Sequence, residues 1–123
     1  MEIVQMTQLP RIGSSWNFVG ADHGGVPVSF YLVEAQPGKG APLHLHDYDE
    51  VVLVEAGSSR MVVGDCIHES GPGDIVVVKA GTPHGFVNAG TEVLRQVDIH
   101  ASARFGQRNL PATATSRAAG LPE

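Results

Sequence analysis

Short apolar and β-branched runs, separated by glycine, proline, aspartate and serine, fill the first hundred residues of the chain. No window before residue 100 keeps apolar residues at helical spacing. The runs predict strands near residues 15–19, 27–35, 42–47, 50–56, 60–63, 66–69, 75–79, 84–88 and 92–100. Because 123 residues suffice for one ordinary domain, the sequence predicts an all-β domain with a closed or sandwiched antiparallel structure.

The last part of the chain has a different composition. Residues 101–123 are small and polar, with two prolines and almost no aliphatic side chains. We therefore expect a β domain over residues 1–100 and a C-terminal tail over 101–123 that is extended or partly disordered.

Charge and cysteine content exclude several classes of protein. The formal net charge is −5 and there are only two lysines, so no basic stripe for nucleic acid is present. The longest apolar runs are far shorter than a membrane helix, and the N-terminus lacks the features of a signal peptide. Cys66 is the only cysteine, which excludes an internal disulfide and a thiolate metal cluster. A cytoplasmic protein with no membrane partner is expected.

A histidine pair carries the first sign of chemistry. In His44-Leu45-His46 the two imidazoles lie two residues apart, so on a strand they point to the same face and can converge on one metal ion. Glu50, at the start of the next apolar run, offers a carboxylate oxygen. His84 follows a Gly-Thr-Pro turn and begins another strand. Taken separately, these residues are more typical of a pair of surface histidines followed by an acidic loop and, for His84, of a structural histidine.

The spacing of these residues forms two motifs. The first is G-x5-HxH-x3-E-x6-G from Gly38 to Gly57, and the second, after fifteen residues, is G-x5-K-x-G-x2-H-x3-N from Gly73 to Asn88. Together they resemble the two signature motifs of the cupin superfamily. The first matches at every fixed position, whereas in the second Lys79 replaces the usual proline, which affects the rigidity of the turn before His84.

The resemblance implies a cupin double-stranded β-helix, a jelly-roll barrel with six strands in each sheet, and a homodimer. It implies a metal ion on His44, His46, Glu50 and His84. Three nitrogens and one carboxylate oxygen suit Fe, Mn, Co, Ni, Cu or Zn, and the ligand set does not choose among them. Asn88 is expected to satisfy local backbone groups.

Strand alternation extends the site into a small, mostly apolar pocket. The candidate lining residues are Tyr31, Val52, Val54, Phe86, Asp98 and His100. For Asp98 and His100, a role beside the metal or in proton transfer is the alternative to a structural one. His23 and His68 are expected at the surface, and His100 is grouped with them outside the ligand set. Trp16 and Phe18 are expected to seal the barrel or form a dimer contact.

Three functions remain open. The first is a metal-dependent enzyme acting on a small, weakly charged oxygenated metabolite, by dioxygenase-type cleavage or by isomerisation or enolisation. The scarcity of basic residues argues against sugar-phosphate substrates. The second is a non-catalytic cupin that binds or senses a small molecule, and the third is a metal-free structural protein.

Overall fold

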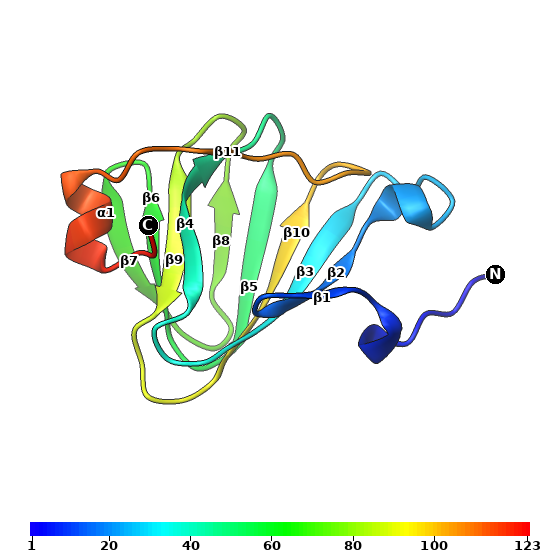
Figure 1. Ribbon diagram of the computed structural model, residues 1–123, viewed down its shortest axis with the longest axis horizontal. Helices are drawn as coiled ribbons and strands as arrows, with labels where there is room; N and C mark the ends of the chain where they lie inside the picture. The colour runs from blue at the N-terminus through cyan, green and yellow to red at the C-terminus, as the bar shows by residue number, and fades with distance from the viewer.

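The computed structural model describes residues 1–123 and consists mainly of antiparallel strands. The first sheet contains, in spatial order, β1 (Arg11–Ile12), β2 (Ser15–Phe18), β3 (Ser29–Ala35), β10 (Leu94–His100), β5 (Glu50–Ala56) and β8 (Ile75–Val78). The second contains β11 (Arg108–Asn109), β4 (Gly40–Leu45), β9 (His84–Asn88), β6 (Ser59–Val63) and β7 (Cys66–Ser70). The two sheets face each other across the molecule (Figure 1).

The predicted all-β jelly-roll fold is confirmed, and each of the nine predicted strands ends within two residues of its predicted limits. The expectation of six strands in each sheet is corrected, because the second sheet has five. The two-residue strands β1 and β11 were not predicted, since neither has an apolar run. Short 3-10 helices cover Met6–Gln8 and Gly20–Asp22.

The main core lies between the sheets at one end of the barrel. Alternating residues of β3, β5 and β10 meet Met61 of β6 and Phe86 of β9 there. The buried cluster consists of Val33, Ala35, Val52, Val54, Met61, Phe86 and Leu94. Burial of one such side chain contributes about 1.5–3 kcal/mol, so this cluster is a large part of what holds the sheets together. The polar site described below occupies the rest of the interior.

The C-terminal tail is folded, which corrects the expectation of an extended or partly disordered segment. Residues 101–113, called here the C-terminal strap, run across one end of both sheets and include β11 (Figure 1). Helix α1 (Ala114–Ala119) follows, with Thr113 and Ser116 forming a reciprocal capping box and Gly120 ending the helix in the left-handed conformation.

Helix α1 and the residues after it cover the outer face of the second sheet. Ala119 and Leu121 join Leu43, Val62 and Val87 in a second buried cluster. The few apolar residues of the tail are therefore the ones that fasten it. No helix of the structure has the length and apolar character needed to cross a lipid bilayer.

Local details agree with the motif interpretation. Asn88 is 1% exposed, and its side-chain amide donates to the Ala35 and Glu92 carbonyls and accepts from the Gly90 N–H, as expected for a structural role. Gly57 adopts φ +83°, and a Cβ there would lie 2.7 Å from the Val93 carbonyl oxygen. Both conformation and space require glycine at this corner.

Gly40 provides a test of the packing of β4 against β9. A Cβ at this position would lie 2.0 Å from the Phe86 carbonyl oxygen and 2.8 Å from the Val87 Cα, both backbone atoms. We expect Gly40→Ala to lower the free energy of unfolding by about 3 kcal/mol, because neither atom can move without disturbing the strand pair. Urea denaturation with an unchanged m-value measures this.

The matched control is Gly71→Ala, where an added Cβ meets nothing within 4 Å and φ is not positive. Its effect should stay within about 0.5 kcal/mol. Equal stability of the two variants would contradict the described approach of β4 and β9.

Candidate metal centre

Two neighbouring strands and the start of a third bring the predicted ligands together. His44 on β4 lies directly opposite His84 on β9, and Glu50 begins β5 in the facing sheet. His46 lies one residue beyond the end of β4. The ligand atoms of His44, His46, Glu50 and His84 lie within 4.8 Å of one another, and all four side chains are buried. The structure thus assembles these residues from two motifs that are well separated in sequence.

Backbone carbonyls fix the orientation of the three imidazoles. The Nδ1 of His44 lies 2.6 Å from the Pro42 carbonyl oxygen, that of His84 2.8 Å from the Thr82 carbonyl, and that of His46 2.5 Å from the Gly106 carbonyl. Since a carbonyl only accepts, each Nδ1 must carry the proton. Each Nε2 therefore has a free lone pair, which is the arrangement of histidine in metal sites.

The Nε2 atoms crowd around one carboxylate oxygen. Glu50 Oε1 lies 3.1 Å from Nε2 of His46 and 3.3 Å from Nε2 of His84. The His46 Nε2 atom is fully buried, is not aligned for hydrogen bonding with Glu50, and has no other partner. A buried, orphaned nitrogen lone pair beside a buried carboxylate is costly for a protein alone, and a divalent cation satisfies both. The residues present therefore fit a metal ion.

Electrostatics support the same conclusion. Burial lowers the pKa of His44 to about 4, so this imidazole is neutral near pH 7. Burial raises the pKa of Glu50, but the close imidazoles of His46, His84 and His100 outweigh it and hold the pKa below its usual range. Burial likewise lowers the pKa of His46, and contacts with Glu50 and the Gly106 carbonyl more than offset it, so this pKa is raised. The cluster attracts positive charge around Glu50.

His100 belongs to this site, which corrects its grouping with His23 and His68. It is 1% exposed, and its Nε2 lies 3.3 Å from Glu50 Oε1. Its Nδ1 lies 2.8 Å from the hydroxyl of Tyr48. If the phenol donates to Nδ1, the Nε2–H points at the carboxylate, whereas the opposite tautomer would place a lone pair against it. The contact with the carboxylate therefore favours the tautomer of His100 with its proton on Nε2.

Tyr48 was missed by the sequence analysis. Its hydroxyl contacts Gly106 as well as His100, accepting from the Gly106 N–H at 3.1 Å and lying 3.2 Å from the Gly106 carbonyl. The partner residue lies in the strap, 58 positions further along the chain, and no local pattern predicts such a contact. Tyr48 therefore fastens the segment that orients His46.

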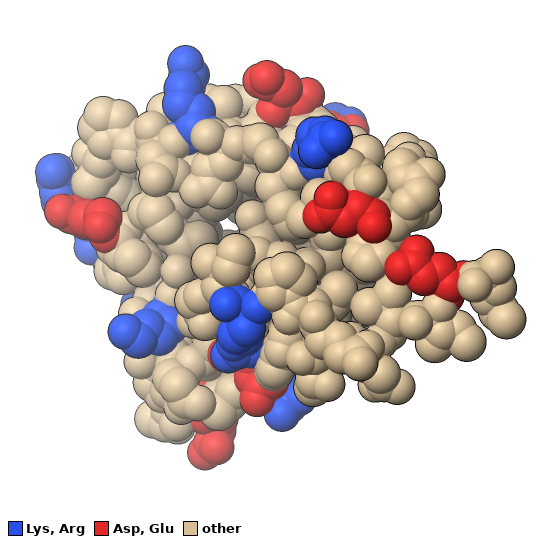
Figure 2. Space-filling model, turned by 45° about the vertical axis from the view of Figure 1, so that its right-hand side comes forward, with Lys and Arg blue, Asp and Glu red and all other residues tan.

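A cavity of about 520 Å³ opens beside the metal cluster. Figure 2 shows a hollow near the middle of the molecule with uncharged residues at its rim. Of the predicted lining residues, the wall contains Tyr31, Val52, Phe86, Asp98 and His100, together with the ligands His44, Glu50 and His84. Val54 is not in the wall: it faces inward as alternation predicts, but it is fully buried in the core.

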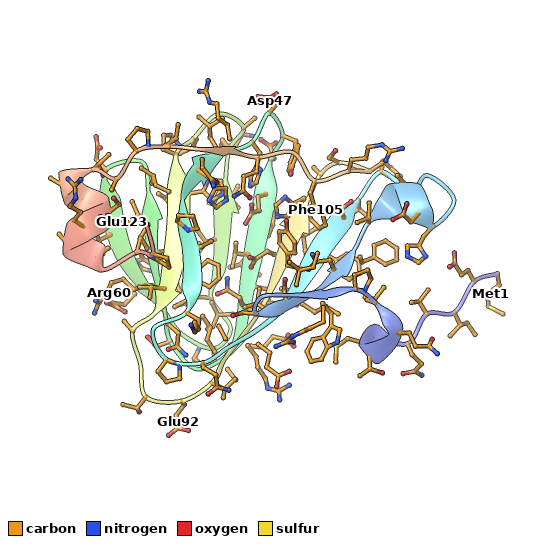
Figure 3. The ribbon with its side chains drawn as sticks, viewed as in Figure 1. Met1, Asp47, Arg60, Glu92, Phe105 and Glu123 are labelled. Carbon is orange, nitrogen blue, oxygen red and sulfur yellow. The ribbon has the colours of Figure 1, made fainter.

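Other wall residues come from parts of the chain without a motif. The β1–β2 hairpin contributes residues around Ser14, β2 contributes Asn17, and the strap contributes Phe105 and Gln107. Phe105 lies beneath the strap beside β10 and β3 (Figure 3), with its ring stacked on Tyr31 at 4.1 Å between centroids. No lysine or arginine lines the cavity.

The remaining candidates lie outside the site. Lys79 is exposed and pairs with Asp49 at 2.8 Å, and Asp49 also accepts from the Ala80 N–H. This ion pair holds the turn in which proline is missing. His68 and Cys66 are exposed, and the half-buried His23 stacks on Phe18 and pairs with Glu2 at 2.7 Å.

Comparison with known families and curated proteins gave two matches. Residues 31–100 match the family described as "Cupin domain". The HTH-type transcriptional activator RhaS of Mannheimia succiniciproducens is 31% identical over 68 residues, which cover 55% of this chain and 25% of that protein. The chain thus spans about a quarter of the length of this relative.

Solved structures share the fold. A conserved protein from Klebsiella pneumoniae with a double-stranded β-helix domain superposes with a TM-score of 0.70 at 20% identity, over 87% of this chain and 89% of that one. Oxalate decarboxylase from Bacillus subtilis gives 0.77 at 18% identity, over 87% and 31%. An oxalate oxidase gives 0.73 at 20% identity, over 89% and 63%. At such identities the likeness concerns the fold.

Metal content tests the centre directly. We expect His84→Ala to reduce the affinity for Mn²⁺ or Zn²⁺ by at least about 100-fold, because changes to mere outer-shell partners of a ligand already cost 10–100-fold. Elemental analysis after dialysis and calorimetric titration of the metal-free protein measure it.

The control is His68→Ala, which removes an exposed histidine of β7 far along the second sheet. It should retain the metal content of the natural chain. If His84→Ala keeps its metal, or both variants lose it equally, the assignment of the ligands is wrong.

Proposed function

The chain belongs to the cupin family, and on that premise we propose that it is a metal-dependent enzyme acting on a small, weakly charged, oxygenated molecule. The reaction class is dioxygenase-type cleavage or isomerisation through an enolate. The main support for this proposal is that the metal cluster opens into a cavity of about 520 Å³ whose wall has no lysine or arginine.

The direction of the ligands supports catalysis at the cavity. His44, Glu50 and His84 form part of the cavity wall, whereas His46 faces the strap side. A divalent ion on these four residues would supply Lewis-acid or oxygen-binding chemistry when bound. The chain's own contribution is to hold Glu50 ionised, to orient the imidazoles, and to exclude water with Phe86, Val52 and Phe105.

The wall also argues against oxalate, the molecule in the names of two structural neighbours. Oxalate is a compact dianion, and recognition of a dianion generally needs cationic anchors. Apart from an ion on the four ligands, this cavity offers no cationic group, and its volume exceeds what six heavy atoms fill. The proposed substrate is therefore larger and less charged than oxalate.

The metal remains to be determined. Mn(II) centres occur in the solved oxalate decarboxylase, so manganese is the first ion to test. Iron, cobalt, nickel, copper and zinc suit the same ligands.

A non-catalytic sensing role is the second candidate. It is favoured by the match to part of a transcriptional activator, where the related segment makes up a quarter of the protein. In this case the cavity binds its ligand without converting it.

Turnover distinguishes the two functions. Protein loaded with Mn²⁺, Fe²⁺, Ni²⁺ or Zn²⁺ is assayed for product formation and O₂ uptake with diketones, catechols, flavonols, hydroxy acids and oxalate. We expect conversion of at least one uncharged compound and none of oxalate, and we expect Glu50→Ala to lower the rate at least about 100-fold.

Glu55→Ala is the matched control, because Glu55 lies on the same strand with its side chain exposed. It should keep the full rate. Tight binding without turnover for every metal would favour the sensing role and overturn the enzymatic one.

A further inference from the structure

A row of polar side chains crosses the wall of the cavity beside the metal centre. Asn17 of β2 lies opposite Tyr31 of β3, and Tyr31 lies opposite Asp98 of β10. All three line the cavity. The next row along the same face holds His100 and Glu50, which also pair across strands. Rows on one face are about 7 Å apart, so the polar row is one small ring away from the metal cluster.

Each member of the row keeps a free hydrogen-bonding group. The Asn17 side-chain oxygen accepts from Ser15 at 2.7 Å, which leaves its amide donors free. The Tyr31 ring stacks on Phe105, and its hydroxyl makes no hydrogen bond within the protein. Asp98 is 5% exposed and accepts from Gln96 at 2.8 Å through one oxygen only. Free polar groups facing a cavity point to a ligand that pairs with them.

The wall of the cavity favours an uncharged ligand group, because it contains no cationic side chain. Burial raises the pKa of Asp98 well above its usual range, which favours its protonated form, a hydrogen-bond donor. No lysine or arginine lies in the wall to pair with an anionic group in this row. A hydroxyl or carbonyl oxygen meets donors without needing such a partner.

We propose that Asn17, Tyr31 and Asp98 form a subsite for an uncharged hydroxyl or carbonyl oxygen at the end of the substrate remote from the metal cluster. This inference rests on the proposed function. It specifies a substrate with two oxygen-bearing ends and an apolar or aromatic body. Val33, Met61 and Phe86 in the wall contact that body.

Calorimetric titration of the metal-loaded protein with three matched diketones tests the subsite. The probes are benzoylacetone, para-hydroxybenzoylacetone and para-carboxybenzoylacetone. We expect the hydroxyl to improve affinity about tenfold, the gain of one or two good hydrogen bonds, and the carboxylate to weaken binding. Tyr31→Phe and Asn17→Ala should reduce the hydroxyl preference to twofold or less, the preference being the ratio of the two affinities measured in the same variant.

Asp98→Asn should retain much of the preference, because it keeps a neutral donor, whereas Asp98→Leu should lose it. Asn109→Ala, exposed on β11, is the control. A hydroxyl preference that survives Tyr31→Phe and Asn17→Ala, or tightest binding of the carboxylate probe, overturns the subsite.

If none of the three diketones binds, the proposed function is contradicted, because the metal centre then does not bind the diketone group. Titration of the metal-free protein with para-cresol then tests the row alone, and absence of binding there overturns it.

Discussion

The burial of the Glu50 carboxylate is the constraint on which the site depends. Taking a carboxylate out of water costs several kcal/mol even after the protein relaxes, and the cost must be offset by close positive or donating partners. The Nε2 atoms of His46, His84 and His100 lie 3.1–3.3 Å from one Glu50 oxygen. Two of these atoms have lone pairs directed at the carboxylate. A cation between these lone pairs and the carboxylate would satisfy all of them, with His100 as a further close contact of Glu50.

The constraint extends to the peptide backbone. Each ligand imidazole is aimed by a carbonyl, and the three carbonyls belong to Pro42, Thr82 and Gly106. The first two lie two residues before their histidines, so the motif strands themselves provide them. The third lies in the C-terminal strap, which Tyr48, β11 and the cap of α1 hold in place. The tail is thus part of the metal centre, although it contributes no ligand.

This difference explains what the sequence could and could not predict. The spacing of His44, His46 and Glu50 reflects strand geometry and a short turn, so local sequence determines it and a motif records it. His46 orientation depends on Gly106, which is sixty positions away, and no local pattern determines that contact. The C-terminal tail was expected to be extended or partly disordered because it has few aliphatic residues. Its capping pair Thr113 and Ser116, followed by Gly120, was a helix signal that could have been found.

The register of the first sheet places two rows of polar residues on its inner face, one at the metal centre and one in the cavity wall. One inner row, with Glu50 and His100, lies at the metal centre. The adjacent row, with Asn17, Tyr31 and Asp98, faces the cavity. The substrates of structural neighbours at about 20% identity do not transfer to this chain, because at that identity the likeness concerns the fold and not the residues of this row. A polar, uncharged wall beside a metal cluster favours a ligand that is itself uncharged and carries an oxygen at each end.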